Sequence, residues 1–264
     1  MRVARIPYLN AEPFYAGWGE APPFEVVDMV PSALGRAARA GEIDGGLMAT
    51  ADYIELENEF ELVDPRLGVA ASRHVRSVLL LSNEPPSGLN GRRIALTDES
   101  STSVRLLKLL ARARWKIDAT WVPEHEISGD PRGQVDGLLL IGDRALEAMA
   151  APDRSGWVRT IDLATEWWMW QGLPFVFAVW VARRTLPERE RSRFAGFLAG
   201  SLAVGRQRIA DLVATRPASL GQPEVLRQYL EHFDYRLYDA ELEAIDRFRL
   251  LLAEHQIEPT PVKA

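Results

Sequence analysis

The segment from Asp162 to Trp180, DLATEWWMWQGLPFVFAVW, constrains the fold more than any other part of the chain. Its first half is compatible with a helix, carries three tryptophans and stops at Gly172, a residue type favoured just after a helix ends. After Pro174 the run FVFAVWV has no polar break, which is typical of a β-strand buried on both faces of its sheet. Exposing so much apolar surface to water is costly. We therefore predict that this segment lies inside the molecule, at the boundary between two domains.

The composition is ordinary for a soluble globular protein and excludes several kinds of chemistry. With 264 residues, 47% of them hydrophobic and 26% charged, the chain can form one large domain or two of medium size. It contains no cysteine, which excludes disulfides, thiolate nucleophiles and Cys-ligated metals. The four histidines show no HxH or HExxH spacing. We therefore expect no metal site and no cofactor.

Charge and hydropathy indicate the kind of partner that the chain binds. The net charge of −6 argues against nucleic acid. No apolar run is long enough to span a membrane, and the N-terminal MRVARIPYLN lacks the apolar core of a signal segment. We expect a cytoplasmic protein that binds a small molecule, with no membrane contact and no obligate protein partner. Nearly all positive charge is arginine, whose forked side chain suits carboxylate ligands.

The first part of the chain alternates strand-like and helix-like segments. The predicted elements are strands at 2–9, 24–30 and 44–48 and a helix at 33–40. This βαβ rhythm indicates a mainly parallel sheet. Asn10 and Thr50 follow the ends of two of these strands. Because open α/β sheets bind ligands beyond the carboxyl ends of their strands, both residues are binding candidates.

A run of hydroxyl residues follows a predicted strand at 93–96. Its members Ser100, Ser101, Thr102 and Ser103 lead directly into an apolar helix face. Free N–H groups and the positive end of the helix dipole attract anions at such a helix start. We predict an anion-binding corner here; the alternative is that the four residues only cap the helix. The GxxxxGK[ST] pattern is absent, so nucleotide phosphate is not implied.

The chain divides into two α/β halves and a helical tail. A strand within 134–141 ends at Gly142-Asp143, before another helix. Three helices are predicted beyond Pro187, at 188–215, 224–233 and 240–255. Crossings between the halves are expected near 82–92 and 173–182, giving one lobe of 1–82 plus 177–264 and a second lobe of 83–176. Asn10, Thr50, Ser100 to Ser103 and Asp143 would then line one cleft between the lobes.

Six motifs in the first 182 residues carry a resemblance to a known family. They are IPYLN (6–10), GEIDGGL (41–47), VRSVLLLS (75–82), DESSTS (98–103), LLLIGDRAL (138–146) and GLPFVFAVW (172–180). In this order they resemble the chorismate dehydratases of the futalosine route to menaquinone. That family has the type 2 periplasmic-binding-protein fold, so the resemblance implies a two-lobed α/β fold with a ligand cleft between the lobes. The helical C-terminal tail matches only in general character.

The resemblance also implies a reaction and site residues. The reaction is a lyase reaction, the cofactor-free loss of water from the dicarboxylate chorismate, which gives 3-[(1-carboxyvinyl)oxy]benzoate. Asn10 of IPYLN and Ser77 of VRSV are carried over as catalytic residues, and the hydroxyl corner and Asp143 as binding candidates. Each has a structural alternative: Asn10 could close a turn, Ser77 could satisfy strand backbone and Asp143 could only cap a helix. The general base stays open between His74, Glu12 and the substrate's own side-chain carboxylate.

Three other functions fit the same fold. A solute-binding protein is disfavoured by the missing signal-like segment, and a cytosolic sensor domain by the missing helix-turn-helix pattern. Both would bind a small carboxylate. The related dihydroxynaphthoate synthases carry an N-terminal Cys-Pro-Asn-Asp-like motif that this sequence lacks.

Overall fold

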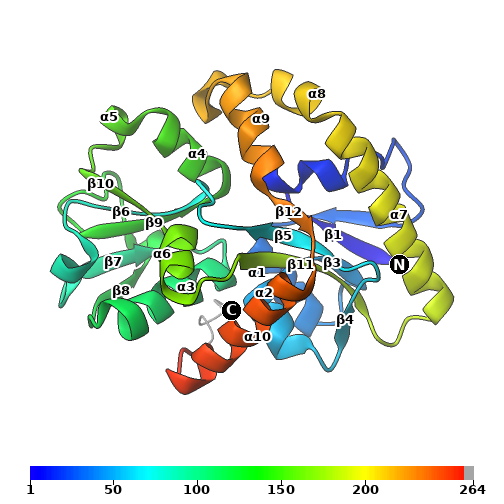
Figure 1. Cartoon of the computed structure of the whole chain (residues 1–264), viewed down its shortest axis with the longest axis horizontal. Helices are drawn as coiled ribbons and strands as arrows, with labels where there is room; N and C mark the ends of the chain where they lie inside the picture. Colours follow the sequence, from blue (N-terminus) through cyan, green and yellow to red (C-terminus); the bar gives the residue numbers. More distant parts are fainter. Residues whose placement is uncertain (259–264) are drawn as a thin grey trace.

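The computed structural model describes residues 1–258 and contains two β-sheets with helices packed around them (Figure 1). The larger sheet is formed by β1 (Arg2–Arg5), β2 (Glu25–Asp28), β3 (Gly45–Ala49), β4 (Phe60–Leu62), β5 (Leu67–Ala71), β11 (Phe175–Arg183) and β12 (Asp234–Arg236). The smaller sheet is formed by β6 (Val78–Ser82), β7 (Arg93–Leu96), β8 (Thr120–Pro123), β9 (Gly137–Ile141) and β10 (Arg159–Asp162). The strand orders are β12-β5-β11-β3-β1-β2, with β4 beside β11, and β10-β6-β9-β7-β8.

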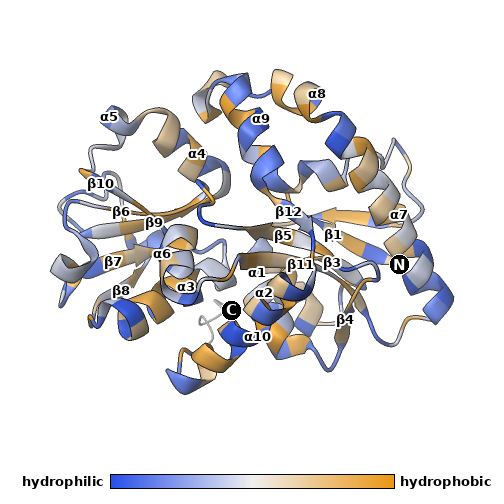
Figure 2. Cartoon of the chain, viewed as in Figure 1, coloured by the Kyte–Doolittle hydropathy of each residue, from blue (hydrophilic) through white to orange (hydrophobic). Residues whose placement is uncertain are grey.

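The α-helices are α1 (Pro31–Arg39), α2 (Thr50–Leu56), α3 (Ser101–Leu109), α4 (Gly142–Ala150), α5 (Pro152–Ser155), α6 (Leu163–Gln171), α7 (Glu188–Gln207), α8 (Ile209–Ala214), α9 (Pro223–His232) and α10 (Asp239–Glu254). Short helical turns are η1 (Leu9–Phe14), η2 (Pro86–Leu89), η3 (Leu110–Trp115), η4 (Glu124–Glu126) and η5 (Ala218–Leu220). Figure 2 shows hydrophobic residues along β6 and β9, whose positions are all buried, and many polar residues on α9. Within the described residues, no helix combines the length and the apolar character needed to cross a membrane.

The segment 162–180, which we predicted to lie at a domain boundary, is buried along its strand but not along its whole helix. β11 lies inside the larger sheet, between β3 and β5, and is buried at most positions. Trp167 is fully buried, donates a hydrogen bond from Nε1 to the carbonyl of Pro174 (3.0 Å) and meets the Phe175 ring edge-on. Trp168 and Trp170 remain partly exposed. The prediction is confirmed for the strand and for Trp167, while the other two tryptophans are only partly buried.

The expectation of a mainly parallel arrangement is wrong. β1 pairs in parallel with β2 and β3, and β7 pairs in parallel with β8 and β9, as the βαβ rhythm requires. β11, however, is antiparallel to β3, β4 and β5, and β6 is antiparallel to β9 and β10. These strands follow crossings from one sheet to the other rather than helical crossovers within a sheet. They therefore enter their sheet from the opposite end.

The first crossing lies earlier in the chain than the expected 82–92. Strand β6 forms its ladders with β9 and β10, so residues 78–82 belong to the smaller sheet rather than to the lobe expected to end at residue 82. The polypeptide leaves the larger sheet after β5 and returns to it at β11. We propose that lobe 1 comprises 1–71 and 175–258, and that lobe 2 comprises 78–171. The segments 72–77 and 172–174 connect them.

Helix α7 of the C-terminal tail packs against η1, the turn that follows β1. β1 ends at Arg5, four residues before the expected end, because Pro7 has no N–H to continue a ladder. Helix α7 packs on the turn η1 so closely that an added Cβ at Gly205 would stand 2.0 Å from the carbonyl oxygen of Pro13. The Ser201 hydroxyl donates to the carbonyl of Phe14 at 2.6 Å. This packing fixes η1 relative to the sheet. The expected helix at 188–215 is present but is interrupted at Arg208, between α7 and α8.

Candidate functional site

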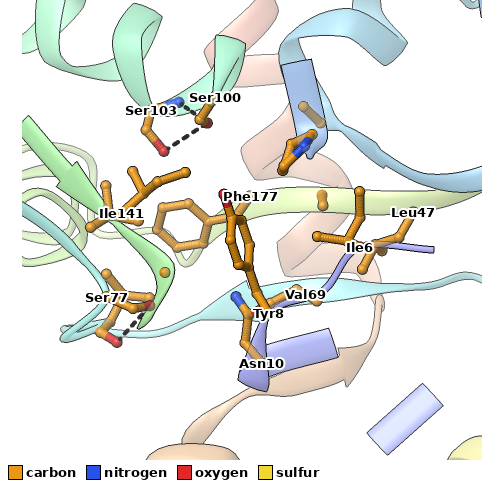
Figure 3. Close-up of a pocket in the computed structure, with 16 residues that line it drawn as sticks. Ile6, Tyr8, Asn10, Leu47, Val69, Ser77, Ser100, Ser103, Ile141 and Phe177 are labelled. Atoms are coloured by element: carbon orange, nitrogen blue, oxygen red, sulfur yellow. Dashed lines mark hydrogen bonds between the residues drawn. The ribbon is translucent and has the colours of Figure 1, made fainter. Parts of the chain in front are cut away.

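A cavity between the two sheets takes residues from both lobes and from the first connecting segment (Figure 3). It encloses about 560 Å³ of space that no protein atom fills, part of it open to solvent. Lobe 1 contributes Ile6, Tyr8, Asn10, Pro31, Leu47, Ala49, Val69, Phe177 and Ala178. Val75, Ser77, Val78, Ser100, Ser103, Ile141 and Gly142 form the other side. A largely apolar lining with a few polar groups is typical of a site for a small organic molecule. We call this the central cavity.

Asn10 lies in the central cavity because η1 carries it there. It is the second residue of this turn, which begins just past β1 and is held from behind by α7. Figure 3 shows its side chain directed toward the cavity next to Tyr8. An amide offers both donors and an acceptor, so it can orient either a hydroxyl or a carboxylate.

Ser77 lines the opposite side of the central cavity, immediately before β6. Its side chain is buried, and the hydrogen bond from its hydroxyl to the carbonyl of Val75 is long, at 3.4 Å. Burial raises the pKa of the neighbouring Tyr229, and a side-chain hydrogen bond with Ser77 opposes that rise. The serine hydroxyl is therefore held by weak or shared contacts and stays within reach of a ligand.

The four hydroxyl residues form the predicted helix start, but only two of their side chains face the central cavity. Ser100 caps α3: its hydroxyl accepts a hydrogen bond from the Ser103 N–H at 3.1 Å and donates to the Ser103 hydroxyl at 3.0 Å. Both residues line the central cavity. Ser101 instead donates to Asp52 Oδ2 at 2.6 Å, and the Thr102 hydroxyl accepts from the N–H of Ala51 at 3.0 Å. These two hydroxyls connect α3 to α2 of the other lobe rather than facing the cavity.

The remaining two candidates lie beside the central cavity rather than in its lining. Thr50 begins α2 and is buried, and its hydroxyl has no hydrogen-bond partner within residues 1–258; its neighbour Ala49 lines the cavity instead. Asp143 lies in the first turn of α4, and its Oδ1 accepts a hydrogen bond from the N–H of Leu9 at 3.2 Å. Burial raises the pKa of Asp143, and this hydrogen bond acts against the rise. Asp143 thus joins lobe 2 to the turn that carries Asn10.

Tyr8 and Gly142 also line the central cavity, and sequence reasoning did not name them as site candidates. Tyr8 donates a hydrogen bond of 2.6 Å to Glu99 Oε2, from one lobe to the other, and burial followed by this bond raises the pKa of its phenol. Gly142 has a left-handed backbone, with φ of 57°, and an added Cβ would stand 3.1 Å from the Tyr8 ring. Tyr8 and Glu99 lie within the motifs IPYLN and DESSTS, yet no local pattern pairs residues 91 positions apart.

The two protein groups considered as bases are occupied elsewhere. Glu12 forms an ion pair with Arg216 at 3.1 Å. The His74 ring stacks on His232 with centroids 4.1 Å apart, and burial together with His232 lowers the pKa of His74. Neither residue lines the central cavity. In the part of the chain that the structure describes, no three His, Asp or Glu side chains are grouped so that they could hold a metal ion.

Sequence comparison relates nearly the whole chain to one family. A family described as menaquinone biosynthesis matches residues 1–254. A chorismate dehydratase from Thermus thermophilus is 35% identical over 242 residues, which is 85% of this chain and 85% of that protein.

Solved structures confirm the expected two-lobed fold. A protein from Archaeoglobus fulgidus aligns with a TM-score of 0.72 at 17% identity, covering 97% of this chain and 98% of its own. The periplasmic aliphatic sulphonate binding protein from Escherichia coli aligns at 0.66 and 18% identity, covering 100% and 94%. A Candida albicans protein described as having the generic periplasmic binding protein fold aligns at 0.65 and 10% identity, covering 100% and 97%. At these identities the likeness concerns the fold alone.

Proposed function

The chain belongs to the menaquinone-biosynthesis family, and from that premise we propose that it is a hydro-lyase that removes water from chorismate. The observation that carries the proposal is the meeting of Asn10, Ser77 and the start of α3 in one mostly apolar cavity, in a chain related to a chorismate dehydratase. The product is 3-[(1-carboxyvinyl)oxy]benzoate. Chorismate is one dehydration away from an aromatic ring, so the site needs orientation and anion stabilisation more than a strong nucleophile.

The start of α3 is suited to one carboxylate of the substrate. The first backbone N–H groups of an α-helix lack partners within the helix, and the helix dipole adds partial positive charge there. Ser100 and Ser103 add hydroxyl groups at the same point, and both line the cavity. We propose that this corner holds a carboxylate against the apolar walls provided by Ile141 and Phe177. A helix N-terminus in such surroundings is an established kind of anion site.

The reaction consists of proton removal and loss of hydroxide. The proton leaves the ring carbon that carries the ether, and the electron pair spreads toward the ring carboxylate as a dienolate. Hydroxide then departs from the neighbouring carbon, the ring becomes aromatic, and proton and hydroxide together make the water released. A well-placed donor on the developing charge contributes roughly 2.7–4 kcal/mol. Asn10 and Ser77 are proposed to orient the ring and the departing hydroxyl from opposite sides of the cavity.

The base is proposed to be the substrate's own side-chain carboxylate. Glu12 is paired with Arg216, and His74 is stacked on His232, so each already has a partner away from the cavity lining. A general base must come within hydrogen-bond reach of the proton it removes. A carboxylate within the bound substrate meets that condition without any movement of the protein, and no cofactor is required.

We also propose that the reaction belongs to the futalosine route and takes place in the cytoplasm. The support for the route is the set of six motifs shared with that family, which includes IPYLN and DESSTS. The support for the compartment is the relationship to a biosynthetic enzyme.

A binding protein without turnover is the second candidate, because the fold is shared with a sulphonate binding protein. Incubating the purified protein with chorismate and following the mixture by proton NMR separates the two. We expect olefinic chorismate signals to fall as aromatic signals rise in equal amount, with Asn10→Ala far slower than the parent. Chorismate that binds but stays unchanged, at enzyme concentrations sufficient to saturate it, would establish the binding protein instead.

A further inference from the structure

A second cavity is lined by residues of the first connecting segment, of α4 in lobe 2, and of η5 and α9 in lobe 1. Figure 1 shows α4 and α9 on the same edge of the molecule. It contains about 820 Å³ of space free of protein atoms, part of it open to solvent. Its lining consists of Arg76, Leu146, Met149, Ala150, Ala218, Leu220, Gly221, Gln222, Val225, Leu226 and Tyr229. We call it the tail cavity. Arg76 and Leu146 lie within the motifs VRSVLLLS and LLLIGDRAL, but neither residue has a role in the proposed reaction.

The tail cavity combines apolar walls with a single cation. Met149 and Val225 leave 42% and 46% of their surface exposed. Of the residues that line it within the described chain, only Arg76 is charged. The backbone N–H of Arg76 donates to Asp162 Oδ2 at 2.7 Å, but its guanidinium has no hydrogen bond or ion pair with any residue from 1 to 258. An unpaired guanidinium next to exposed apolar side chains suits an anion that has an apolar body.

The backbone conformation of Arg76 independently indicates that its side chain binds a partner. Its φ is 62°, a left-handed conformation that costs most residues about 1 kcal/mol and that glycine adopts freely. Arg73, in the same connecting segment, has a similar φ of 71°, but its guanidinium lies over the Trp168 ring, 5.8 Å from the centroid. One of the two strained arginines therefore has a partner in the fold. The other lines a cavity without one.

The two cavities meet at one side-chain contact. Arg76 directly precedes Ser77, which lines the central cavity. Tyr229 lines the tail cavity, and Ser77 lies close enough to its phenol to oppose the rise in pKa that burial causes. A molecule in the tail cavity would thus lie one side chain away from the proposed reaction site.

We propose that the tail cavity binds an organic carboxylate with a ring-shaped apolar body. Arg76 pairs with the carboxylate through its two parallel N–H donors, and Leu146, Met149 and Val225 pack on the ring. If the chain has the proposed function, its product, an aromatic carboxylate, falls within this class. The binding itself follows from the cavity and its unpaired cation.

Benzoate is the probe that tests the proposal, titrated into the protein and followed by ligand-observed NMR. We expect Arg76→Gln to weaken binding roughly tenfold or more, because a charge-assisted bidentate contact is lost. Arg73→Gln is the matched control: it removes the same charge from the same connecting segment and should leave the affinity within about twofold. Ala150→Trp should block binding by volume, since the Cβ of Ala150 lies 3.9 Å from an ideal Cβ at Gly221 across the cavity.

The outcomes separate this proposal from the proposed function. Benzoate that binds the parent, Arg76→Gln and Ala150→Trp with equal affinity occupies another site, and the proposal is then wrong. No binding to the folded parent also overturns it. Turnover of chorismate is measured separately on the parent: turnover without Arg76-dependent binding rejects the tail site alone, whereas Arg76-dependent binding without turnover rejects the proposed reaction alone. Urea unfolding of each variant confirms that a loss of binding is not a loss of folding.

Discussion

The central cavity and the contact between α2 and α3 both lie between the lobes, and both draw on the same four hydroxyl residues in opposite ways. At the α2–α3 contact the hydroxyls are committed: Ser101 bonds Asp52, and Thr102 bonds the backbone of Ala51. In the central cavity, Ser100 and Ser103 bond mainly each other, around the start of the helix. Committed hydroxyls hold the lobes together, whereas those that face a cavity can exchange partners for a ligand. If the proposed carboxylate site is correct, one helix start serves both stability and binding.

The α2–α3 contact is built around two buried charged groups. Asp52 accepts from Ser101 on one oxygen and from Arg39 on the other, the latter at 2.9 Å. Arg105, itself buried, donates to the carbonyl of Ala51 at 3.2 Å and pairs with Glu55. Buried ionic groups that keep all their partners are tolerated, but removing one partner leaves an uncompensated charge. This contact should therefore affect stability far more than turnover, and the central cavity the reverse.

The largest expected effect is on turnover, from changes in the central cavity. Asn10→Ala and Ser77→Ala should each lower kcat by roughly 10²–10³, because small losses of orientation or of one donor cost that much. The free energy of unfolding of each variant should change by about 1 kcal/mol or less. Ser77→Ala loses only one long hydrogen bond, from the serine hydroxyl to the carbonyl of Val75. Steady-state kinetics with chorismate and urea unfolding measure the two quantities.

The controls for that experiment are the two groups set aside as bases. His74→Asn and Glu12→Gln should keep kcat within roughly tenfold, since a true general base contributes about 10²–10⁴. A fall of roughly 10³ in either variant, with folding intact, would assign the base to that residue and reject the substrate-assisted route.

The next effect is on stability, from the α2–α3 contact. Asp52→Ala should lower the free energy of unfolding by roughly 2 kcal/mol, because it leaves the buried hydroxyl of Ser101 without its acceptor and removes one of the two carboxylates that pair with Arg39. Asp28→Ala is the matched control: it also removes an aspartate paired with an arginine, Arg5, but at an exposed site where the loss should be below about 1 kcal/mol. Equal losses in the two variants would contradict the distinction between the contact and the surface.

A smaller effect is expected at Gly142, in the wall of the central cavity beside Tyr8. Gly142→Ala places a Cβ 3.1 Å from the Tyr8 ring and forces a left-handed backbone on alanine, which should cost roughly 1–2 kcal/mol. Because Gly142 also lines the central cavity, we expect KM for chorismate to rise as well. Gly172→Ala has a similar backbone φ of 71° and no atom within 4 Å of the added Cβ, so it should show the stability loss without the change in KM.

The smallest effect concerns pH and Asp143. Burial raises the pKa of this carboxyl above its ordinary value of 3.8, so folding favours the protonated form. The stability that this group contributes is therefore full below pH 3.8 and is lost as the pH rises through the raised pKa. Asp143→Asn keeps an oxygen for the Leu9 N–H but does not ionise. In urea unfolding, the stability of the variant relative to the parent should rise as the pH increases from 3.8 through the raised pKa of the parent's Asp143. A relative fall as the pH increases would reverse the assignment.

Local patterns predicted the parts of this molecule that depend on neighbours in the sequence. The apolar run after Pro174 became β11, and Ser100 became the cap of α3, because burial periodicity and capping act over a few residues. Local patterns could not predict which of the four hydroxyls face the cavity. Whether Ser101 or Ser103 does so depends on how α3 is rotated relative to α2, which belongs to the other lobe.

Long-range pairings limited the rest of the prediction. The loop-like 83–91 suggested a crossing, but β6 before it pairs with β9, more than fifty residues further along the chain. The bond from Tyr8 to Glu99 likewise joins residues 91 positions apart. The candidates Asn10 and Ser77 came from a family resemblance, and their meeting across one cavity became visible only when both lobes were assembled.

A crystal structure of the protein with 3-[(1-carboxyvinyl)oxy]benzoate tests the central claim most directly. We expect the product in the central cavity, with one carboxylate within hydrogen-bond distance of Ser100, Ser103 or the first N–H groups of α3. Asn10 and Ser77 should contact the ring or its ether from opposite sides, while Ser101 and Thr102 keep their bonds to α2. Product bound with neither Asn10 nor Ser77 in contact, or a central cavity left empty at saturating product, would contradict the account.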